Sequence, residues 1–179
     1  MNILIFSDLP TSGFDFPEVQ PDLILLLGDI SLRNLYRIEK KYLCKKIGIL
    51  GNHDKSEYYK EVNISNAHKC ILNVDGLVIA GFQGSPIYND KPFGQHSNEE
   101  VAEFLATINQ PIDIFIAHSN PVYSDTDQDS HRGFAAFNEF IQQHQPKYFL
   151  HGHLHEPFEM KVGNTHIHSI YPYGFIQYK

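Results

Sequence analysis

The chain of 179 residues is long enough for one domain with a full hydrophobic core and too short for two domains of ordinary size, so we expect a single domain over residues 1–179. Hydrophobic residues make up 42% of the sequence, but no uninterrupted apolar run reaches the length of about 18 residues that a membrane span needs. The formal net charge of -7 disfavours extended nucleic acid as a partner, because binding to a phosphate backbone depends on clustered Lys and Arg.

The N-terminal segment, MNILIFSD, is predicted to be a strand. Its apolar run is short and ends in an acid, without the basic residues and the small-residue cleavage site of a signal peptide. The two cysteines, Cys44 and Cys70, have a spacing typical of neither a zinc motif nor a disulfide framework. We therefore expect a cytoplasmic protein.

Further along the chain, apolar runs with strand-like composition alternate with helical patterns. Together with the first run, they predict strands at 2–6, 23–27, 46–50, 77–80, 112–117 and 148–150. Most runs are apolar on both faces, which is typical of sheets that helices cover. Helices are predicted at 32–42, 97–108 and 133–144, and Ser97 and Glu100 give the second of them a capping box.

The last segment of the chain, residues 157–179, has the pattern of a β-hairpin. The runs FEMKV and THIHSI flank Gly163 and Asn164, a two-residue turn signal. The sequence as a whole therefore predicts an α/β core with mixed strands and a terminal hairpin.

Five of the predicted strands end in a polar residue that is able to bind metal. The segments FSD, LLGD, LGNHD, IAH and LHGHLH supply Asp8, Asp29, Asn52, His53, Asp54, His118, His153 and His155. Ligands of α/β sheets bind beyond the carboxyl ends of the strands, so these side chains are expected to converge at one edge. Taken singly, each residue is more often a turn or helix cap, but turn chemistry hardly explains five such sites together.

These residue types suit a pair of divalent ions about 3.5 to 4 Å apart, with a bridging carboxylate and a shared hydroxide that attacks phosphorus in line. Histidine ligands favour transition metals over Mg²⁺ or Ca²⁺, so we expect Mn²⁺, with Fe²⁺ or Zn²⁺ as alternatives. Glycines precede Asp29, Asn52 and His153, which lets the backbone approach a metal or a phosphate closely.

The order Asp, Gly-Asp, Gly-Asn-His-Asp, His and Gly-His-x-His resembles the calcineurin-like metallophosphoesterases from Asp8 to His155, in particular the small metallophosphoesterase-domain proteins. The resemblance implies an α/β fold, a four-layer αββα sandwich of two mixed β-sheets flanked by helices. For the first metal ion it implies the ligands Asp8, Asp29 and His155. For the second it implies Asp29, as a bridge, with Asn52, His118 and His153. It also implies that His53 contacts the phosphate and helps to protonate the leaving oxygen, with Asp54 orienting His53.

The first motif departs from the family pattern, because Asp8-Leu9-Pro10 stands where Asp-x-His is usual. Proline offers no ligand, so we expect the first metal site to be weak or empty. His96, His166, His168 and Asp15 are candidates to replace the ligand, although each also fits a surface or hairpin position. Only ten residues separate Pro10 from Pro21, which predicts a shortened first crossover without the usual helix.

Two loops are candidates to bind the substrate. The loop after His118 resembles a family loop, which makes Asp125, Asp127, His131 and Arg132 candidates to line the pocket; a solvated loop that caps the next helix is the alternative. Arg132 offers a guanidinium fork for phosphate oxygens. In the loop at 84–94, Tyr88 or Phe93 could stack on a nucleobase, although loop aromatics more often pack onto the core. His151 is expected to be a hydrogen-bonded core group.

The expected activity is hydrolysis of a small phosphodiester, or of a phosphomonoester, by metal-activated hydroxide, with Asn52 and His53 positioning the phosphate. The expected partner is thus a small phosphorylated substrate. The preference for a diester rests on the resemblance and on the lack of room for a large capping domain. A catalytically weak scaffold for protein interaction is the alternative that Pro10 favours, and the net charge disfavours a nuclease. The sequence does not indicate an oligomeric state.

Overall fold

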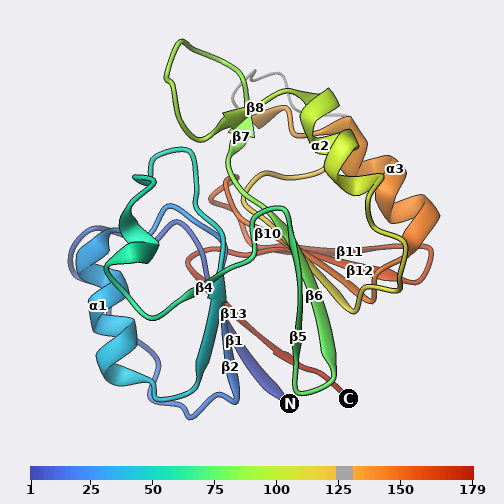
Figure 1. Ribbon diagram of the computed structural model, residues 1–179. Helices are drawn as coiled ribbons and strands as arrows, with labels where there is room; N and C mark the ends of the chain where they lie inside the picture. Colours follow the sequence, from blue (N-terminus) through green and yellow to red (C-terminus); the bar gives the residue numbers. More distant parts are fainter. Residues whose placement is uncertain (124–130) are drawn as a thin grey trace.

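A computed structural model describes residues 1–123 and 131–179 of the chain. Two large β-sheets pack face to face, and helices cover their outer faces, so that the fold has four layers (Figure 1). This arrangement confirms the αββα sandwich of two mixed sheets. Among the described residues, no helix has the length and apolar character to span a membrane.

The first sheet has the strand order β13-β1-β2-β3-β4. Neighbours from β1 to β4 are parallel, and β13 joins the outer edge of β1 in the antiparallel sense. The strands are β1 (Asn2–Phe6), β2 (Leu23–Leu26), β3 (Lys45–Gly48), β4 (Ser65–Asn66) and β13 (Tyr173–Gln177). β1, β2 and β3 therefore all end at the same edge of this sheet.

The second sheet has the order β11-β12-β10-β9-β6-β5, with a parallel centre and antiparallel strands at both edges. Its strands are β5 (Cys70–Val74), β6 (Leu77–Phe82), β9 (Ile114–Ala117), β10 (Tyr148–His151), β11 (Phe158–Val162) and β12 (Thr165–Ser169). The last two strands confirm the predicted hairpin. A separate short pair, β7 (Ser85–Pro86) and β8 (Gln95–His96), closes the base of a loop that projects at the top of Figure 1.

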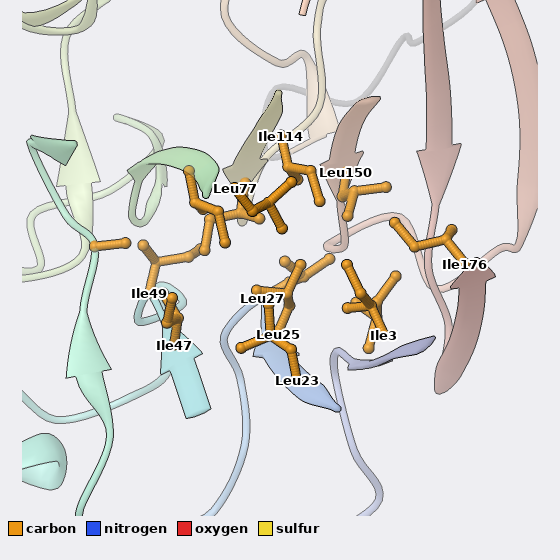
Figure 2. Close-up of a cluster of buried hydrophobic side chains, with 14 of the residues drawn as sticks. Ile3, Leu23, Leu25, Leu27, Ile47, Ile49, Leu77, Ile114, Leu150 and Ile176 are labelled. Carbon is orange, nitrogen blue, oxygen red and sulfur yellow. The ribbon is translucent and has the colours of Figure 1, made fainter. Parts of the chain in front are cut away.

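The space between the two large sheets is filled by aliphatic side chains, as Figure 2 shows. Ile3, Leu25 and Ile47 of the first sheet face Ile114 and Leu150 of the second. Successive strand residues point to opposite faces, so each strand contributes alternate residues to this layer and the others to its outer face. Burial of each such side chain contributes about 1.5–3 kcal/mol to the stability of the fold, and together these side chains hold the two sheets against each other.

Three α-helices cover the outer faces: α1 (Leu32–Lys41) on the first sheet, and α2 (Asn98–Leu105) and α3 (Ala135–His144) on the second. A 3-10 turn, η1 (Tyr58–Lys60), follows β3. Ser97 accepts a hydrogen bond from the backbone amide of Glu100 and so caps α2, as the capping box predicts. The Glu100 carboxylate, however, binds Lys69 and His96.

The first crossover is as short as the sequence predicts, since the chain between β1 and β2 contains no helix. Phe14 and Phe16 occupy the outer face of the sheet there. Their rings pack edge-on to Phe6, with centroid distances of 6.3 and 5.5 Å. Aromatic side chains of the loop thus cover the surface of the sheet that a helix would otherwise bury.

Candidate metal centre

The six predicted metal ligands lie just beyond the carboxyl ends of parallel strands. They follow β1 (Asp8), β2 (Asp29), β3 (Asn52), β9 (His118) and β10 (His153 and His155). Three of these strands belong to the first sheet and two to the second. Because the sheets pack with these ends at a common edge, the structure brings together residues that lie up to 147 positions apart in the sequence.

Asp29 and His118 meet at the middle of this edge. The Nε2 atom of His118 lies 3.5 Å from the Oδ2 atom of Asp29 and 2.9 Å from the Oδ1 atom of Asn52. One oxygen of Asp8, one of Asp29 and one ring nitrogen of His118 all lie within 4.8 Å of one another. Such a cluster of two carboxylates and an imidazole has the donor atoms and the spacing to hold a divalent transition metal.

The orientation of His118 is set by a backbone carbonyl. Its Nδ1 atom donates a hydrogen bond to the carbonyl oxygen of Leu27 at 2.8 Å, so the Nε2 atom faces Asp29 and Asn52. Metal-binding histidines commonly have their second nitrogen fixed in this way. The fully buried ring of His118 is therefore aimed at the cluster before any ion binds.

The charges of the cluster shift one another's pKa values. Burial lowers the pKa of His118, but the carboxylates of Asp29 and Asp8 outweigh it and raise the pKa to about 9. Burial raises the pKa of Asp29, but His118 and a backbone hydrogen bond from His53 hold it below its usual range. In the absence of a metal, Asp29 and a protonated His118 thus form an ion pair. The positive charge of His118 then replaces that of a metal ion.

Asp8 links the two histidines that follow β10. Its Oδ2 atom accepts hydrogen bonds from the backbone amide of His153 at 2.8 Å and from the hydroxyl of Ser7 at 2.5 Å. Its Oδ1 atom lies 3.2 Å from the Nε2 atom of His155, whose ring stacks on Tyr171 at a centroid distance of 5.2 Å. The ring of His153 lies 4.9 Å from that of His118. Asp8 and His155 therefore form one side of the centre, and His118 and His153 the other.

Four of the six candidate ligands have left-handed backbone conformations. The φ angles are 51° for Asp8, 52° for Asp29, 70° for His153 and 55° for His155. Such conformations cost non-glycine residues on the order of 1–3 kcal/mol each and gather at functional sites. They turn the chain sharply at the strand ends, which directs the side chains into the cluster.

The glycines that precede Asp29, Asn52 and His153 are closely packed against the cluster and its backbone. A Cβ atom at Gly51 would overlap the Asp29 carboxylate, and one at Gly152 would overlap Ser7 and the Asp8 carboxylate. Gly28, with a φ angle of +93°, lies against the backbone of Gly51. A side chain at Gly51 or Gly152 would displace these carboxylates, and one at Gly28 would displace the backbone of Gly51.

Asp54 binds the backbone around Asp29. Its carboxylate accepts hydrogen bonds from the amides of Asp29 and Gly51, both at 2.8 Å, and of Ile30 at 3.1 Å. Burial and the nearby Asp29 carboxylate raise the pKa of Asp54 to about 7, against the effect of its backbone donors. No hydrogen bond joins Asp54 to the ring of His53 within the described part of the chain. The contacts of Asp54 therefore fix the loops that carry Asp29 and His53.

His53 has an exposed side chain beside the cluster, and its backbone amide donates a hydrogen bond to the Oδ1 atom of Asp29 at 2.9 Å. His131 also lies beside the cluster, because its ring is 4.9 Å from that of His153 in an edge-on contact. Arg132 follows it at the surface. Asp125 and Asp127 lie outside the described residues.

The side chain of Asn52 has a partner that the sequence did not indicate. Its Nδ2 atom donates a hydrogen bond to the hydroxyl oxygen of Tyr88 at 2.9 Å, while its Oδ1 atom faces His118. Tyr88 thus determines which end of the amide points into the cluster. His151, by contrast, is the buried group that the sequence predicts: it is hydrogen-bonded to Tyr123 and Gly152, and burial lowers its pKa to about 4.

Pro10 and the four candidate replacements have partners outside the cluster. The carbonyl oxygen of Pro10 accepts a hydrogen bond from the Asn34 side chain at 2.8 Å. Other contacts hold the four candidate replacements: His96 binds Glu100, His168 lies by Glu159, His166 packs on Tyr148, and Asp15 lines a surface hollow with Arg37. In the described ranges, none of the four contacts Asp8 or His155.

Two comparisons of the sequence with known proteins gave matches. The sequence pattern of the calcineurin-like phosphoesterases matches residues 1–157, a range that includes every candidate ligand. The lariat debranching enzyme of Schizosaccharomyces pombe is 25% identical to this chain over 178 residues. That alignment covers 76% of this chain and 38% of the enzyme, so the chain spans well under half the length of this relative.

Solved structures share the fold. The phosphopantetheinyl hydrolase PptH of Mycobacterium tuberculosis has a TM-score of 0.70 at 13% identity, over 94% of this chain and 89% of that chain. A Vps29 protein of Entamoeba histolytica has a TM-score of 0.50 at 12% identity, over 95% of this chain and 73% of that chain. At these identities the likeness shows a common fold and nothing about substrates.

The ion pair in the centre predicts a pH dependence of stability. Folding raises the pKa of His118 from 6.5 to about 9, so its stabilising effect is complete below pH 6.5 and is lost as the pH rises through 9. The free energy of unfolding of metal-free protein should therefore fall between these values, and urea titrations in a chelator would measure it. Added Mn²⁺ should stabilise the protein more at the higher pH, because His118 must release its proton to bind a metal. If the free energy of unfolding of a His118→Gln variant fell equally over this pH range, His118 would not be the source of the pH dependence.

Proposed function

The chain belongs to the calcineurin-like phosphoesterase family, and from this premise we propose that it hydrolyses a small phosphodiester with the help of two divalent metal ions. A phosphomonoester is the alternative substrate. The observation that carries the proposal is the position of Asp29, whose carboxylate lies within reach of both Asp8 and His118 at the junction of the two sheets. A carboxylate in this position can be shared by two ions.

The donor set fits such ions, with Mn²⁺ as the proposed metal and Fe²⁺ or Zn²⁺ as alternatives. Asp8 and His155 would hold the first ion, His118, His153 and Asn52 the second, and Asp29 both. When bound, the ions lower the pKa of a water molecule and stabilise negative charge on the phosphate oxygens. Leu27 and Tyr88 support this assignment, because they fix the metal-facing atoms of His118 and Asn52.

The protein would supply the remaining steps through His53 and its surroundings. The exposed ring of His53 stands beside Asp29, where it would contact a phosphate oxygen and give a proton to the departing alcohol. Asn52 would help to position the phosphate, and His131 and Arg132 lie where they would meet the rest of the substrate.

We further propose that the two metal sites differ in strength. The ligands of the second site, Asn52, His118 and His153, are buried. On the first side, Pro10 contributes no ligand, and the side chain of His155 is 61% exposed. Water competes more effectively for an ion with fewer and more exposed ligands, so the first site should exchange its metal more readily.

A catalytically weak scaffold for protein interaction remains a second candidate function. It is favoured by Pro10 and by exposed aromatic side chains on β13, where Tyr173 and Phe175 are 42% and 49% exposed beside a surface hollow. Exposed apolar patches are typical of protein-binding surfaces. The measurement of turnover separates the two functions.

Metal-stripped protein supplied with Mn²⁺ should hydrolyse bis-p-nitrophenyl phosphate faster than p-nitrophenyl phosphate. Asp29→Asn should reduce both rates to background, because it weakens the ligand shared by the two ions. Asp75→Asn makes the same chemical change in the distant turn between β5 and β6, and should leave both rates intact. Absence of turnover in the unmodified protein, despite tight metal binding, would favour the scaffold.

His53→Ala should lower kcat by about 10²–10⁴-fold, the usual contribution of a general acid, while the affinity for Mn²⁺ stays the same. The reason is that the hydrogen bond from His53 to the cluster is donated by its backbone amide, which the substitution keeps. His166→Ala, a change of an exposed histidine on β12, is the control and should have little effect. Full activity in His53→Ala would refute the role of this residue.

Calorimetric titration of metal-stripped protein with Mn²⁺ should reveal one tight site and a second site that is weaker by about tenfold or more. The difference follows from the contrast in burial between the two ligand groups. His155→Ala should abolish the weak site and preserve the tight one. Two sites of equal, high affinity would contradict the proposed asymmetry.

A further inference from the structure

Two hollows that share lining residues lie near residues in contact with the candidate metal centre, and the mechanism above does not say what they would bind. One has a volume of about 520 Å³ and the other of about 460 Å³. Both are lined by Pro86, Ile87 and Arg132, which form the border between them. Sites for small organic molecules usually have volumes of about 300–1,000 Å³. We call the two hollows together the side groove.

Both walls of the side groove are joined to the metal centre. On one wall, Tyr88 lines the smaller hollow and accepts the hydrogen bond from Asn52. On the other wall, Arg132 directly follows His131, whose ring contacts that of His153. A molecule with its phosphate at the metal centre would therefore extend its remaining part into this groove.

The wall formed by the loop between β7 and β8 is held in place by its own contacts (Figure 1). The side-chain oxygen of Gln95 accepts hydrogen bonds from the backbone amides of Tyr88 and Asn89, at 2.8 and 3.2 Å. Gly94, with a φ angle of +78°, packs so closely on the backbone of Asn52 that a Cβ atom would come within 2.8 Å of it. The loop is thus fixed against the same residue that is proposed to bind the second ion.

The chemistry of the two walls differs. On the loop, Pro86 and Ile87 present apolar surface to both hollows, and Ile87 is 63% exposed although it is strongly hydrophobic. Asn89 and Asp90 add polar groups to the smaller hollow. Arg132 lines the same two hollows with an exposed guanidinium group that forms no ion pair or hydrogen bond with any residue in the described ranges. An alkyl chain in the groove would leave the guanidinium unused, and a second phosphate would gain nothing from the apolar wall.

We propose that the side groove binds a flat heteroaromatic ring, such as a nucleobase, carried by the substrate. Such a ring can stack on the guanidinium plane of Arg132 and place its remaining surface against Pro86 and Ile87. This inference rests on the proposed function, because it requires the phosphate to lie at the metal centre. It narrows the substrate class to nucleotide-like phosphoesters.

The test compares two ligands that differ only in the ring. With Mn²⁺-loaded protein, calorimetry should show that adenosine 5′-monophosphate binds about tenfold or more tightly than ribose 5-phosphate, in keeping with the contribution of one stacked base. Arg132→Gln and Ile87→Ser should each reduce this ratio severalfold and leave the affinity for ribose 5-phosphate nearly unchanged. Arg33→Gln, at an exposed position on α1, is the matched control and should keep the full ratio.

Equal binding of the two ligands would overturn the proposal, and so would a ratio that survives in both groove variants. Equal weakening of both ligands by Arg132→Gln would also overturn it, because Arg132 would then serve the phosphate and not the ring. The proposed function fails separately: a preserved preference for adenosine 5′-monophosphate without any Mn²⁺-dependent hydrolysis would leave a nucleotide-binding protein. Hydrolysis without the preference would leave a phosphoesterase that lacks this subsite.

Discussion

The contact between Asp29 and His118 joins the two sheets at the edge where the candidate ligands meet, and the arrangement of the site depends on it. The carboxylate follows β2 of the first sheet and the imidazole follows β9 of the second, with 3.5 Å between Oδ2 and Nε2. Each partner is fixed by backbone groups: the amide of Asp29 donates to Asp54, and the carbonyl of Leu27 accepts from His118. A shift of one sheet relative to the other would separate the pair, so the aliphatic core between the sheets sets the geometry of the centre.

This arrangement is costly for the isolated protein. Two carboxylates and a protonated imidazole are buried close together, and Asp8, Asp29, His153 and His155 all have left-handed backbone conformations. Buried charge and strained backbone each cost on the order of a kcal/mol or more, and the packed core must offset them. A bound divalent ion would replace the proton on His118 and satisfy both carboxylates. The expected gain in stability on metal binding and the expected pH dependence thus have the same physical origin.

The sequence was sufficient to predict the parts of the structure that depend on local patterns. The strands that precede Asp8, Asp29 and His118 are apolar runs that end in a polar residue, and the terminal hairpin has a recognisable turn. Strand β13 was not predicted, because its exposed residues, Tyr173 and Phe175, hide its alternation and only its pairing with β1 defines it. The contact of Tyr88 with Asn52 and those of Asp54 with the backbone were also missed, since they join residues that the fold alone brings together.

Pro10, which stands where the resemblance to the family implies a histidine, belongs to the shortened first crossover. In place of a helix, Phe14 and Phe16 cover the outer face of the first sheet, and the chain then enters β2 at Leu23. Pro10 lies at the start of this loop, where Asn34 of α1 holds its carbonyl oxygen. The backbone of the loop is therefore tied to the outer helix at this position. On this side of the centre, the candidate ligands are Asp8, the shared Asp29 and His155, and the 61% exposed side chain of His155 leaves this side accessible to water.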